Sequence, residues 1–382
     1  MKRVVVGIAG AGRGTELHMG GYERVHGVEL RFKKLLARRP EQLYPARDRY
    51  GFEEAVLSFD ALIDDPEINL IDICTPPYTH PEMIMRALEA GKNVICEKPL
   101  CGCFDPGLTK QQMFESLQES LDRLAGAVAR SGRRFMYAEN FVYAPAVQRA
   151  AELLTARKSR ILFLKGEESL KGSSSPVAGE WSKTGGGTLM RVGSHPLGAA
   201  LYLKQVEALA RGTEIHLESV LCDCAQITPT LSEYEHRAIA ARPQDVEDMC
   251  TLVMVFSDQS RATVIANDTL LGGSRNYVEL YCNDAVIHCR LTLSDLMETY
   301  LPDADGLENF SLSEMLPVKT GWNRPFVADT IVRGYVDEMQ DFCEAVAFDR
   351  EAKANFRLAH DTTLAMYAAY YSAEAGRRVR LA

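Results

Sequence analysis

Three things are scarce in this chain of 382 residues: long apolar runs, excess basic charge and clustered cysteines. The longest unbroken apolar run, Leu197–Leu203, has about seven residues against the roughly 20 that span a bilayer, so no membrane helix is expected. Lysine and arginine number 43 against 52 acidic residues, and the net charge of −9 argues against a nucleic-acid-binding protein. The one basic cluster, Lys33, Lys34, Arg38 and Arg39, is too short to change this expectation.

The ten cysteines are too sparse for a disulfide scaffold, and most of them, such as Cys74, stand in apolar strand-like runs. This favours reduced thiols in a cytoplasmic protein. The pairs Cys101-x-Cys103 and Cys222-x-Cys224 have the look of metal ligands. A one-residue spacer alternates across a strand, however, and neither pair has a histidine close in sequence, so no metal site is expected.

The first 138 residues alternate strand-like and helix-like segments, which predicts a doubly wound parallel sheet of the dinucleotide-binding type. The N-terminal run MKRVVVGIAG is broken by Arg13 and Glu16 and lacks a cleavage pattern, so it is interpreted as a first strand and not as a signal peptide. The predicted strands are Val4–Ile8, Val28–Ala37, Ala55–Leu57, Leu70–Cys74, Val94–Cys96 and Phe135–Tyr137.

The pattern changes after Asn140, and residues 139–382 are predicted to form a second, α+β domain that binds substrate and mediates oligomerisation. Its β-rich runs are joined by turn signals and predict a large, mostly antiparallel open sheet with helices on one face. The predicted strands are Arg160–Gly166, His216–Cys224, Asp248–Phe256, Ala262–Asn267, Tyr277–Cys282 and Val286–Leu293. The predicted helices are Ala144–Ala156, Gly187–Lys204, Phe326–Ala347 and Phe356–Ala375.

A glycine-rich turn, Gly7–Thr15, follows the first strand and precedes a helix. Gly10 permits a tight turn, and Gly12 lets the backbone approach a pyrophosphate at the helix N-terminus. The third position of this fingerprint is Thr15 in place of glycine or alanine. The alternative is an ordinary strand–helix turn in an unrelated α/β fold.

The end of the second strand bears on the choice of dinucleotide. An acidic residue there would bind the ribose 2′-hydroxyl of NAD, but Ala37 is followed by Arg38 and Arg39, and Arg13 adds a further cation in the glycine turn. This favours NADP, with NAD possible. The alternative is that these arginines are solvated surface charges.

Two further motifs, Cys74–His80 and Cys96–Leu100, follow the fourth and fifth strands at the ligand-binding edge of such a sheet. Lys98 stands next to a glutamate and before a proline, which suits proton transfer to a substrate hydroxyl beside a nicotinamide. As an isolated triplet, Glu97–Pro99 is more often a surface turn. The further candidate cofactor contacts in these motifs are Thr75, Pro76, His80, Glu97 and Lys98 itself.

With these motifs, the glycine turn and Gly185–Gly198 (GGGTLMRVGSHPLG), the sequence resembles the glucose-fructose oxidoreductase / inositol dehydrogenase / rhizopine catabolism (Gfo/Idh/MocA) family over nearly the whole chain. The resemblance implies an N-terminal Rossmann domain, a C-terminal domain with an open sheet, and a tightly held NAD(P). It also implies that Lys98 and His195 face the substrate carbon that exchanges hydride, and that the protein is a homo-oligomer, a dimer or tetramer.

The sequence departs from the family pattern at Arg191, where many members carry an aspartate four residues before the histidine. In a regular helix Arg191 and His195 share a face, so Arg191 would point at the site and bind a substrate carboxylate or hydroxyl. The alternative is that Arg191 turns away to pair with an acidic residue of the second domain. Further candidate substrate contacts, each of which could equally be structural, are Asn140, Tyr143 and Glu168.

Together these observations predict an NAD(P)-dependent oxidoreductase that transfers hydride between nicotinamide and a secondary hydroxyl or ketone of a sugar, glycoside or cyclitol. One alternative is an NAD-dependent glycoside hydrolase that oxidises its sugar transiently. Another is a non-catalytic dinucleotide-binding protein. The expected partners are a small sugar or polyol and further copies of the chain, with neither nucleic acid nor membrane.

Overall fold

The chain forms two compact units in the computed structural model. The residues that the structure describes are 2–293, 297–307, 318–325 and 328–381. The first unit consists of Met1–Tyr143 and Gly334–Tyr367, and the second of Ala144–Arg333 and Ala368–Ala382.

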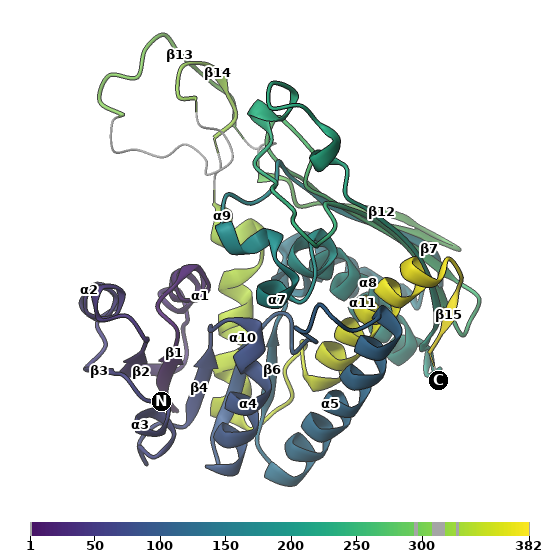
Figure 1. Ribbon diagram of the computed structural model, residues 1–382. Helices are drawn as coiled ribbons and strands as arrows, with labels where there is room; N and C mark the ends of the chain where they lie inside the picture. The colour runs from purple at the N-terminus through teal and green to yellow at the C-terminus, as the bar shows by residue number, and fades with distance from the viewer. Residues whose placement is uncertain (1, 294–296, 308–317, 326–327, 382) are drawn as a thin grey trace. The chain divides into compact units, whose positions relative to one another are not determined.

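This division differs from a single boundary after residue 138. Helix α10 (Tyr335–Phe348) packs against α1 (Arg13–Tyr22) and strand β1 (Arg3–Ala9), so a late segment returns to the first unit (Figure 1). Gly21 is part of the reason. A Cβ atom at Gly21 would lie 2.7 Å from the Met339 side chain, so only a glycine lets the two helices approach this closely.

The first unit contains a six-stranded parallel sheet, as predicted. Its strand order is β3-β2-β1-β4-β5-β6. Its other strands are β2 (Glu29–Leu36), β3 (Glu54–Val56), β4 (Leu70–Ile73), β5 (Asn93–Glu97) and β6 (Phe135–Ala138). Its further helices are α2 (Pro40–Tyr50), α3 (Asp60–Ile63), α4 (His80–Glu89) and α5 (Lys110–Ser131). Residues Val4–Ala9 of β1 are all buried, because helices cover both faces of a sheet of this kind.

The second unit contains a seven-stranded sheet in the order β12-β11-β7-β10-β9-β8-β15. Every neighbouring pair is antiparallel except β10 with β7, so the prediction of a mostly antiparallel open sheet is confirmed. Its strands are β7 (Ile161–Ser169), β8 (Leu217–Ala225), β9 (Met249–Phe256), β10 (Arg261–Asn267), β11 (Arg275–Cys282), β12 (Val286–Arg290) and β15 (Val379–Arg380). A separate small pair is formed by β13 (Thr299–Leu301) and β14 (Gly321–Asn323).

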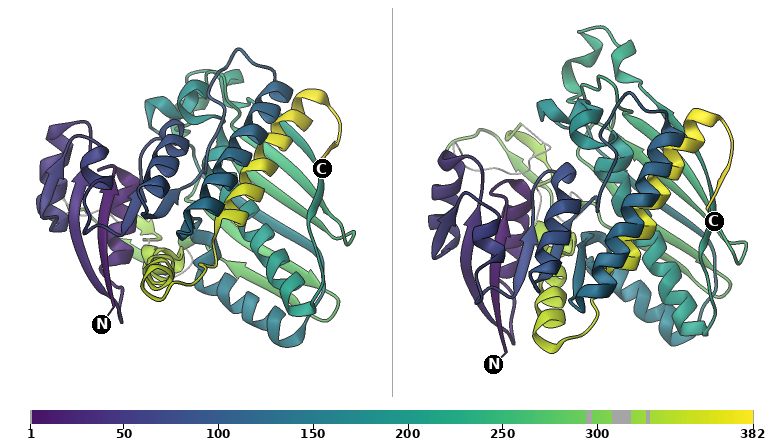
Figure 2. Two further views of the ribbon diagram at one scale, coloured as in Figure 1. Left: turned by 90° about the horizontal axis from the view of Figure 1, so that it is seen from below. Right: turned by 60° about the horizontal axis from the view of Figure 1, so that its bottom comes forward.

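Helices lie on one face of this second sheet (Figure 2). These helices are α6 (Pro145–Arg157) and α8 (Ser194–Arg211). Along β10, buried residues alternate with half-buried residues, because successive side chains of a strand point to opposite faces of the sheet. The predicted helix Gly187–Lys204 is in fact a π-helical turn, Leu189–Gly193, followed by α8.

The C-terminal helices also differ in detail from the prediction. The stretch Phe326–Ala347 forms α9 (Asp329–Val332) and α10, and its first two residues lie outside the described residues. The last helix, α11 (Phe356–Ala375), contains the boundary between the units. Within the described residues, no helix combines the length and apolar character needed to cross a bilayer.

Candidate active site

The glycine turn of the first unit is built so that only glycine fits at Gly10. Its φ is +120°, and a Cβ atom there would lie 2.5 Å from the carbonyl oxygen of Cys74. The Gly10 N–H donates to the Leu36 carbonyl at 2.8 Å, which ties the turn to the end of β2. Thr15 explains the departure from the fingerprint, because its buried hydroxyl donates to the Gly10 carbonyl at 2.9 Å and closes the turn.

The turn leaves room for a pyrophosphate at the start of α1. Among the described residues, no atom lies within 4 Å of a Cβ atom built at Gly12, and no side chain caps the helix at that residue. Helix N-termini of this kind bind phosphate through backbone N–H groups and the helix dipole. The residues present therefore fit a dinucleotide. Arg13, the third candidate here, forms an ion pair with Glu16 at 2.8 Å.

The basic residues in β2 and just after it fall into two classes. Lys34 pairs with Asp65 at 2.8 Å, and Lys33 pairs with Glu67. Arg38 and Arg39 are exposed, and neither guanidinium pairs with an acidic side chain of the described residues. Two guanidinium groups that follow the end of β2 are therefore available to bind an anionic ligand.

The loops after β4 and β5 are joined by His80. Its Nδ1 lies 2.8 Å from the Pro99 carbonyl oxygen and its Nε2 lies 2.8 Å from that of Thr75. The ring is fully buried, and burial lowers the pKa of His80 although the two carbonyls favour its protonated form. His80 was predicted to contact the cofactor. In the structure it holds the two loops together, and Thr75 and Pro76 stand on the loop that it positions.

Lys98 follows Glu97 at the carboxyl end of β5, and the Lys98–Pro99 peptide bond is cis. The Lys98 N–H donates to Oε2 of Glu97 at 2.9 Å. Oε1 of Glu97 lies 3.3 Å from Nε2 of His18, on α1. A Cβ atom at Gly14 would lie 3.6 Å from the Glu97 side chain, so the glycine turn and the Glu97–Lys98 segment are neighbours at one edge of the sheet.

His18 also binds a carboxylate on its other side, with Nδ1 2.9 Å from Oδ2 of Asp72. The Tyr22 hydroxyl donates to the same oxygen at 3.1 Å, and the Cys74 thiol lies 3.4 Å from the ring. Burial by itself would lower the pKa of His18, but Asp72 raises it well above the usual value, which favours the protonated ring beside the Asp72 carboxylate. Burial raises the pKa of Cys74 to about 12.

Neither this network nor a role for His18 was identified from the sequence. The available signal was Asp72, a carboxylate inside the otherwise apolar strand Leu70–Ile73, since a buried charge needs a partner. Glu338 of α10 also faces the network. Neither of its carboxyl oxygens has a hydrogen-bond partner among the described residues, and burial raises its pKa well above the usual value.

Two other candidates of the first unit, Asn140 and Tyr143, are buried within its core. The Tyr143 hydroxyl donates to Oδ2 of Asp341 at 2.8 Å and accepts from the Ala354 N–H at 3.0 Å. Both functions of that hydroxyl are therefore used, and the structure makes Tyr143 a core residue in place of the expected substrate contact. Asn140 lies on the same short helix, Asn140–Tyr143.

In the second unit, Arg191 lies in the π-helical turn and His195 in the first turn of α8. The premise of a regular helix through Arg191 and His195 is therefore wrong, because a π-turn changes the spacing of side chains around the axis. The Arg191 guanidinium forms an ion pair with Oδ2 of Asp268. Of the two alternatives open from sequence, the structure thus shows pairing with an acidic residue of the second unit.

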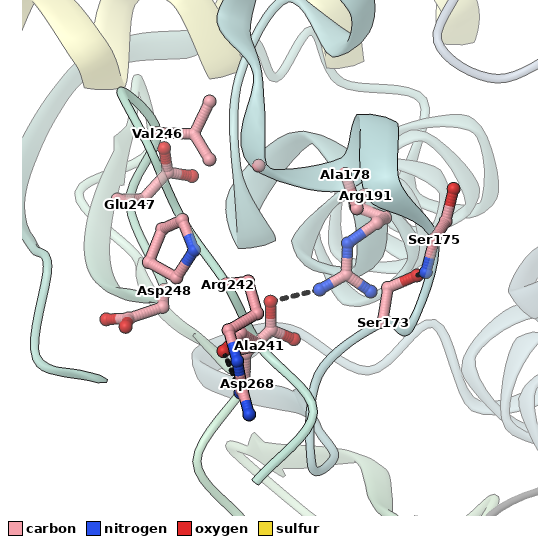
Figure 3. Close-up of a pocket in the computed structure, with 12 residues that line it drawn as sticks. Ser173, Ser175, Ala178, Arg191, Ala241, Arg242, Val246, Glu247, Asp248 and Asp268 are labelled. Carbon is pink, nitrogen blue, oxygen red and sulfur yellow. Dashed lines mark hydrogen bonds and ion pairs between the residues drawn. The ribbon is translucent and has the colours of Figure 1, made fainter. Parts of the chain in front are cut away.

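Arg191 and Asp268 together line a hollow of the second unit (Figure 3). Figure 3 shows the guanidinium directed toward Asp268, with Ser173 and Ser175 on its other side. Burial raises the pKa of Asp268, and Arg191 opposes that shift. The other lining residues include Arg242, Glu247 and Asp248.

Glu247 fixes the start of the π-turn. Its carboxylate accepts the N–H groups of Gly187 and Leu189 and the hydroxyl of Tyr370, each at 2.9 Å. Burial raises the pKa of Glu247 to about 8, while the hydrogen bonds lower it. Glu168, a candidate from sequence, is buried on β7.

One cysteine pair has a neighbour that the sequence did not reveal. Residues two apart on a strand share a face, so Cys222 and Cys224 lie together on β8 with their Sγ atoms 3.6 Å apart. Cys250 of β9 joins them, 3.3 Å from the sulfur of Cys222. The argument that the spacer separates these thiols was therefore wrong. The three sulfur atoms lie close enough together to ligate one metal ion.

Comparison with known proteins agrees with this construction. The oxidoreductase family with an NAD-binding Rossmann fold, Gfo/Idh/MocA, matches residues 4–122. Residues 4–122 are thus similar to the NAD-binding Rossmann domain of this family. The segment matched contains the glycine turn, both loops joined by His80, and Lys98.

Two curated relatives share less than a third of their residues with this chain over the aligned segments. Levoglucosan dehydrogenase of Pseudarthrobacter phenanthrenivorans is 29% identical over 215 residues, which span 53% of this chain and 52% of that protein. The uncharacterized oxidoreductase YrbE of Bacillus subtilis is 25% identical over 282 residues, or 70% of this chain and 77% of that protein. The match to levoglucosan dehydrogenase thus spans about half the length of that relative.

Solved structures share the fold over essentially the whole chain. GenD2 from gentamicin A biosynthesis, in complex with NAD, has a TM-score of 0.79 and 22% identity, covering 100% of this chain and 97% of that one. Levoglucosan dehydrogenase in complex with NADH and L-sorbose has a TM-score of 0.74 and 21% identity, covering 100% of both chains.

Proposed function

We propose that the protein is an NAD(P)-dependent oxidoreductase that interconverts a secondary hydroxyl and a ketone on a sugar, glycoside or cyclitol. The observation that carries this proposal is the position of Lys98, which follows Glu97 at the sheet edge that also bears the glycine turn. Relatives named levoglucosan dehydrogenase and myo-inositol 2-dehydrogenase support the substrate class.

The bound nicotinamide supplies the hydride acceptor or donor. The chain's own residues hold the dinucleotide and move the proton. The turn at Gly10 and Gly12 accommodates the pyrophosphate, and the Lys98 amine takes the proton of the substrate hydroxyl as the carbonyl forms. His195 is proposed to contact the substrate, on the strength of the GGGTLMRVGSHPLG motif alone.

NADP is the proposed cofactor. Arg38 and Arg39 carry unpaired charge at the end of β2, where the 2′-phosphate of a bound NADP lies in folds of this class. Arginine recognises phosphate through paired N–H donors, which gives the preference a physical basis. Relatives in complex with NAD and NADH leave NAD as the second candidate.

Further copies of the chain are the proposed protein partners, through the face of the second sheet that α6 and α8 leave uncovered. Thr263 and Ile265 of β10 are half-buried on that face, and Leu221 of β8 is 39% exposed. An open apolar sheet face of this kind is stabilised by a second sheet. The free thiols of all ten cysteines suit a reducing compartment, so a cytoplasmic location is proposed.

The proposed function is tested by mixing the purified protein with NADP or NAD and a panel of cyclitols, anhydrosugars and glycosides. The expected result is a rise in reduced-nicotinamide absorbance that depends on both components. A dinucleotide that binds but is not reduced by any member of the panel would overturn the proposal in favour of a non-catalytic binding protein.

A further inference from the structure

Three cysteine thiols of the second unit meet on one face of its sheet. Cys222 and Cys224 are two residues apart on β8, and Cys250 of β9 pairs with Cys224 in the antiparallel register. Sγ of Cys222 lies 3.6 Å from Sγ of Cys224 and 3.3 Å from that of Cys250. Among the described residues, the other cysteines form no such group of three thiols.

The backbone around these thiols is fixed by hydrogen bonds to other segments of the second unit. The Cys222 N–H donates to Oγ of Ser372, a buried residue of α11, at 3.0 Å. Beyond the end of β8, the N–H groups of Ile227 and Thr228 donate to the Asp248 carboxylate at 2.7 and 2.8 Å. The three sulfur atoms are therefore held together by the fold itself, which lowers the entropic cost of binding a ligand there.

The three side chains differ in how far they are buried. Cys250 is fully buried, Cys222 is 7% exposed, and Cys224 is half-buried. All three are free thiols. Cys224 is thus the most accessible of the three and marks the side from which a small ligand enters.

The distances between the sulfur atoms suit a shared metal ion. A Zn²⁺ ion with thiolate ligands at about 2.3 Å in tetrahedral geometry places its sulfur atoms about 3.8 Å apart. The separations of 3.6 and 3.3 Å are close to this value, so small side-chain rotations suffice. Mutual hydrogen bonds are a weaker reason for the grouping, because a thiol is a weak donor and a weak acceptor.

Acidic residues beside the cluster favour a cation. Glu247 and Asp223 both act electrostatically on the Cys222 thiol. The Glu247 carboxylate is already occupied, since it accepts the N–H groups of Gly187 and Leu189. Among the described residues, no further potential ligand joins the three sulfur atoms. The fourth position of a tetrahedral ion is therefore left to water.

We propose that Cys222, Cys224 and Cys250 bind one Zn²⁺ ion through three thiolates, with a water molecule as the fourth ligand. Sulfur ligands select zinc and softer ions over Mg²⁺ and Ca²⁺. The three thiols release their protons when the ion binds, and a divalent ion leaves less uncompensated charge at this buried site than Cu⁺ does. The bound ion joins β8 to β9, next to the Glu247 that holds the π-turn.

The test uses the full chain without an affinity tag, stripped of metal with a chelator and kept reduced under anaerobic conditions. Zn²⁺ binding is measured by competition with a chromophoric chelator, and Cd²⁺ is added separately to reveal the thiolate-to-metal charge-transfer absorption in the ultraviolet. The wild type is expected to bind Zn²⁺ and to develop the absorption up to one Cd²⁺ per chain. A wild type that binds no Zn²⁺ and gives no such absorption with Cd²⁺ would overturn the inference.

Two variants locate the ion. Cys224→Ser changes the most accessible ligand, and Cys250→Ala removes a buried one; circular dichroism checks that each variant folds. Each should weaken Zn²⁺ binding by about 10- to 100-fold or more and remove most of the Cd²⁺ absorption. The matched control is Cys103→Ser, which changes the Cys101-x-Cys103 pair of the same spacing. That pair belongs to no group of three potential ligands among the described residues, so binding should stay as in the wild type.

Zn²⁺ binding that is unchanged in folded Cys224→Ser would contradict the site, because the ion would then lie elsewhere. The group His18, Asp72 and Cys74 of the first unit is the other place where the described side chains could hold one. Metal binding is measured without turnover and without dinucleotide. Its outcome is therefore independent of the proposed oxidoreductase function.

Discussion

The candidate residues of the two units differ in how their buried polar groups are paired. In the first unit, His18 joins Asp72 to Glu97, and Glu97 in turn accepts the backbone N–H of Lys98. In the second unit, Asp268 forms an ion pair with Arg191. The first arrangement connects β4 to the segment that follows β5, although neither carboxyl oxygen of Glu338, which faces it, has a hydrogen-bond partner among the described residues. The second arrangement joins the π-turn to the residue that follows β10.

The largest effect that tests this comparison is expected at Lys98, the group that the first network holds. Lys98→Ala should lower kcat by about 10²- to 10⁴-fold, because proton transfer is lost while the glycine turn is untouched. The dinucleotide Kd, measured by fluorescence titration, should stay within the range of the wild type. Lys98→Arg is the matched control for charge. Arginine keeps the cation but is not a base, so recovery of kcat in that variant would contradict proton transfer.

A second effect is expected on stability. Asp72→Asn removes one partner of a fully buried ion pair and should lower the free energy of unfolding by about 3–5 kcal/mol. The exposed pair Arg3–Glu29 provides the comparison, since Glu29→Gln should cost at most about 1 kcal/mol. Urea denaturation measures both.

The loss of stability caused by Asp72→Asn should depend on pH, and the charge state of His18 determines the sign of that dependence. The pKa of His18 is raised in the folded state, so its contribution to stability is complete below the unfolded value of about 6.5 and is lost as the pH rises through the folded value. The stability gap between the wild type and Asp72→Asn should therefore be widest near about pH 6 and narrow under alkaline conditions. A gap independent of pH would show that His18 is not charged in the folded protein. The groups that face the ring are Asp72, Glu97, Cys74, Tyr22 and Glu338.

A smaller effect is expected at the end of β2. Arg38→Ala should raise the Kd for NADP by about tenfold and leave that for NAD unchanged, because only NADP carries the 2′-phosphate. Lys34→Ala is the matched control, since Lys34 is already paired with Asp65. A wild type that binds NAD as tightly as NADP would refute the preference.

The last effect concerns the oligomeric state of the protein and the face of the second sheet that α6 and α8 leave uncovered, and we expect little change in catalysis from it. Ile265→Arg places a charge among the half-buried residues of β10 and should lower the mass measured by light scattering from that of an oligomer to that of a monomer. A wild-type protein that is already monomeric at micromolar concentration would remove the basis for this prediction.

The first unit could be predicted from sequence more fully than the second for a physical reason. Strands β1 and β5 are mostly apolar and buried, and the motifs are short segments that each follow a strand, so Gly10, Gly12 and Lys98 could be placed without knowledge of distant contacts. The Arg191–Asp268 pair joins residues 77 positions apart. Nothing in the local pattern identifies such a partner.

The remaining differences have the same origin. The π-turn at Leu189–Gly193 depends on Glu247, which holds the N–H groups of Gly187 and Leu189 from a separate segment. The hydrogen bonds of the Tyr143 hydroxyl likewise depend on distant residues. Asp341 and Ala354 lie 198 and 211 positions further along the sequence. Side chains that are paired through long-range contacts cannot be told from free ones by spacing alone.

The most direct test of the account follows the hydrogen that is transferred. A polyol that supports cofactor reduction is prepared with deuterium on its ring carbons and incubated with the protein and oxidised dinucleotide, and the nicotinamide is analysed by mass spectrometry. The account predicts one deuterium on the reduced nicotinamide for each ketone formed. Cleavage of a glycoside with no net reduced dinucleotide and no ketone product would contradict it and would assign the protein to transient oxidation in hydrolysis.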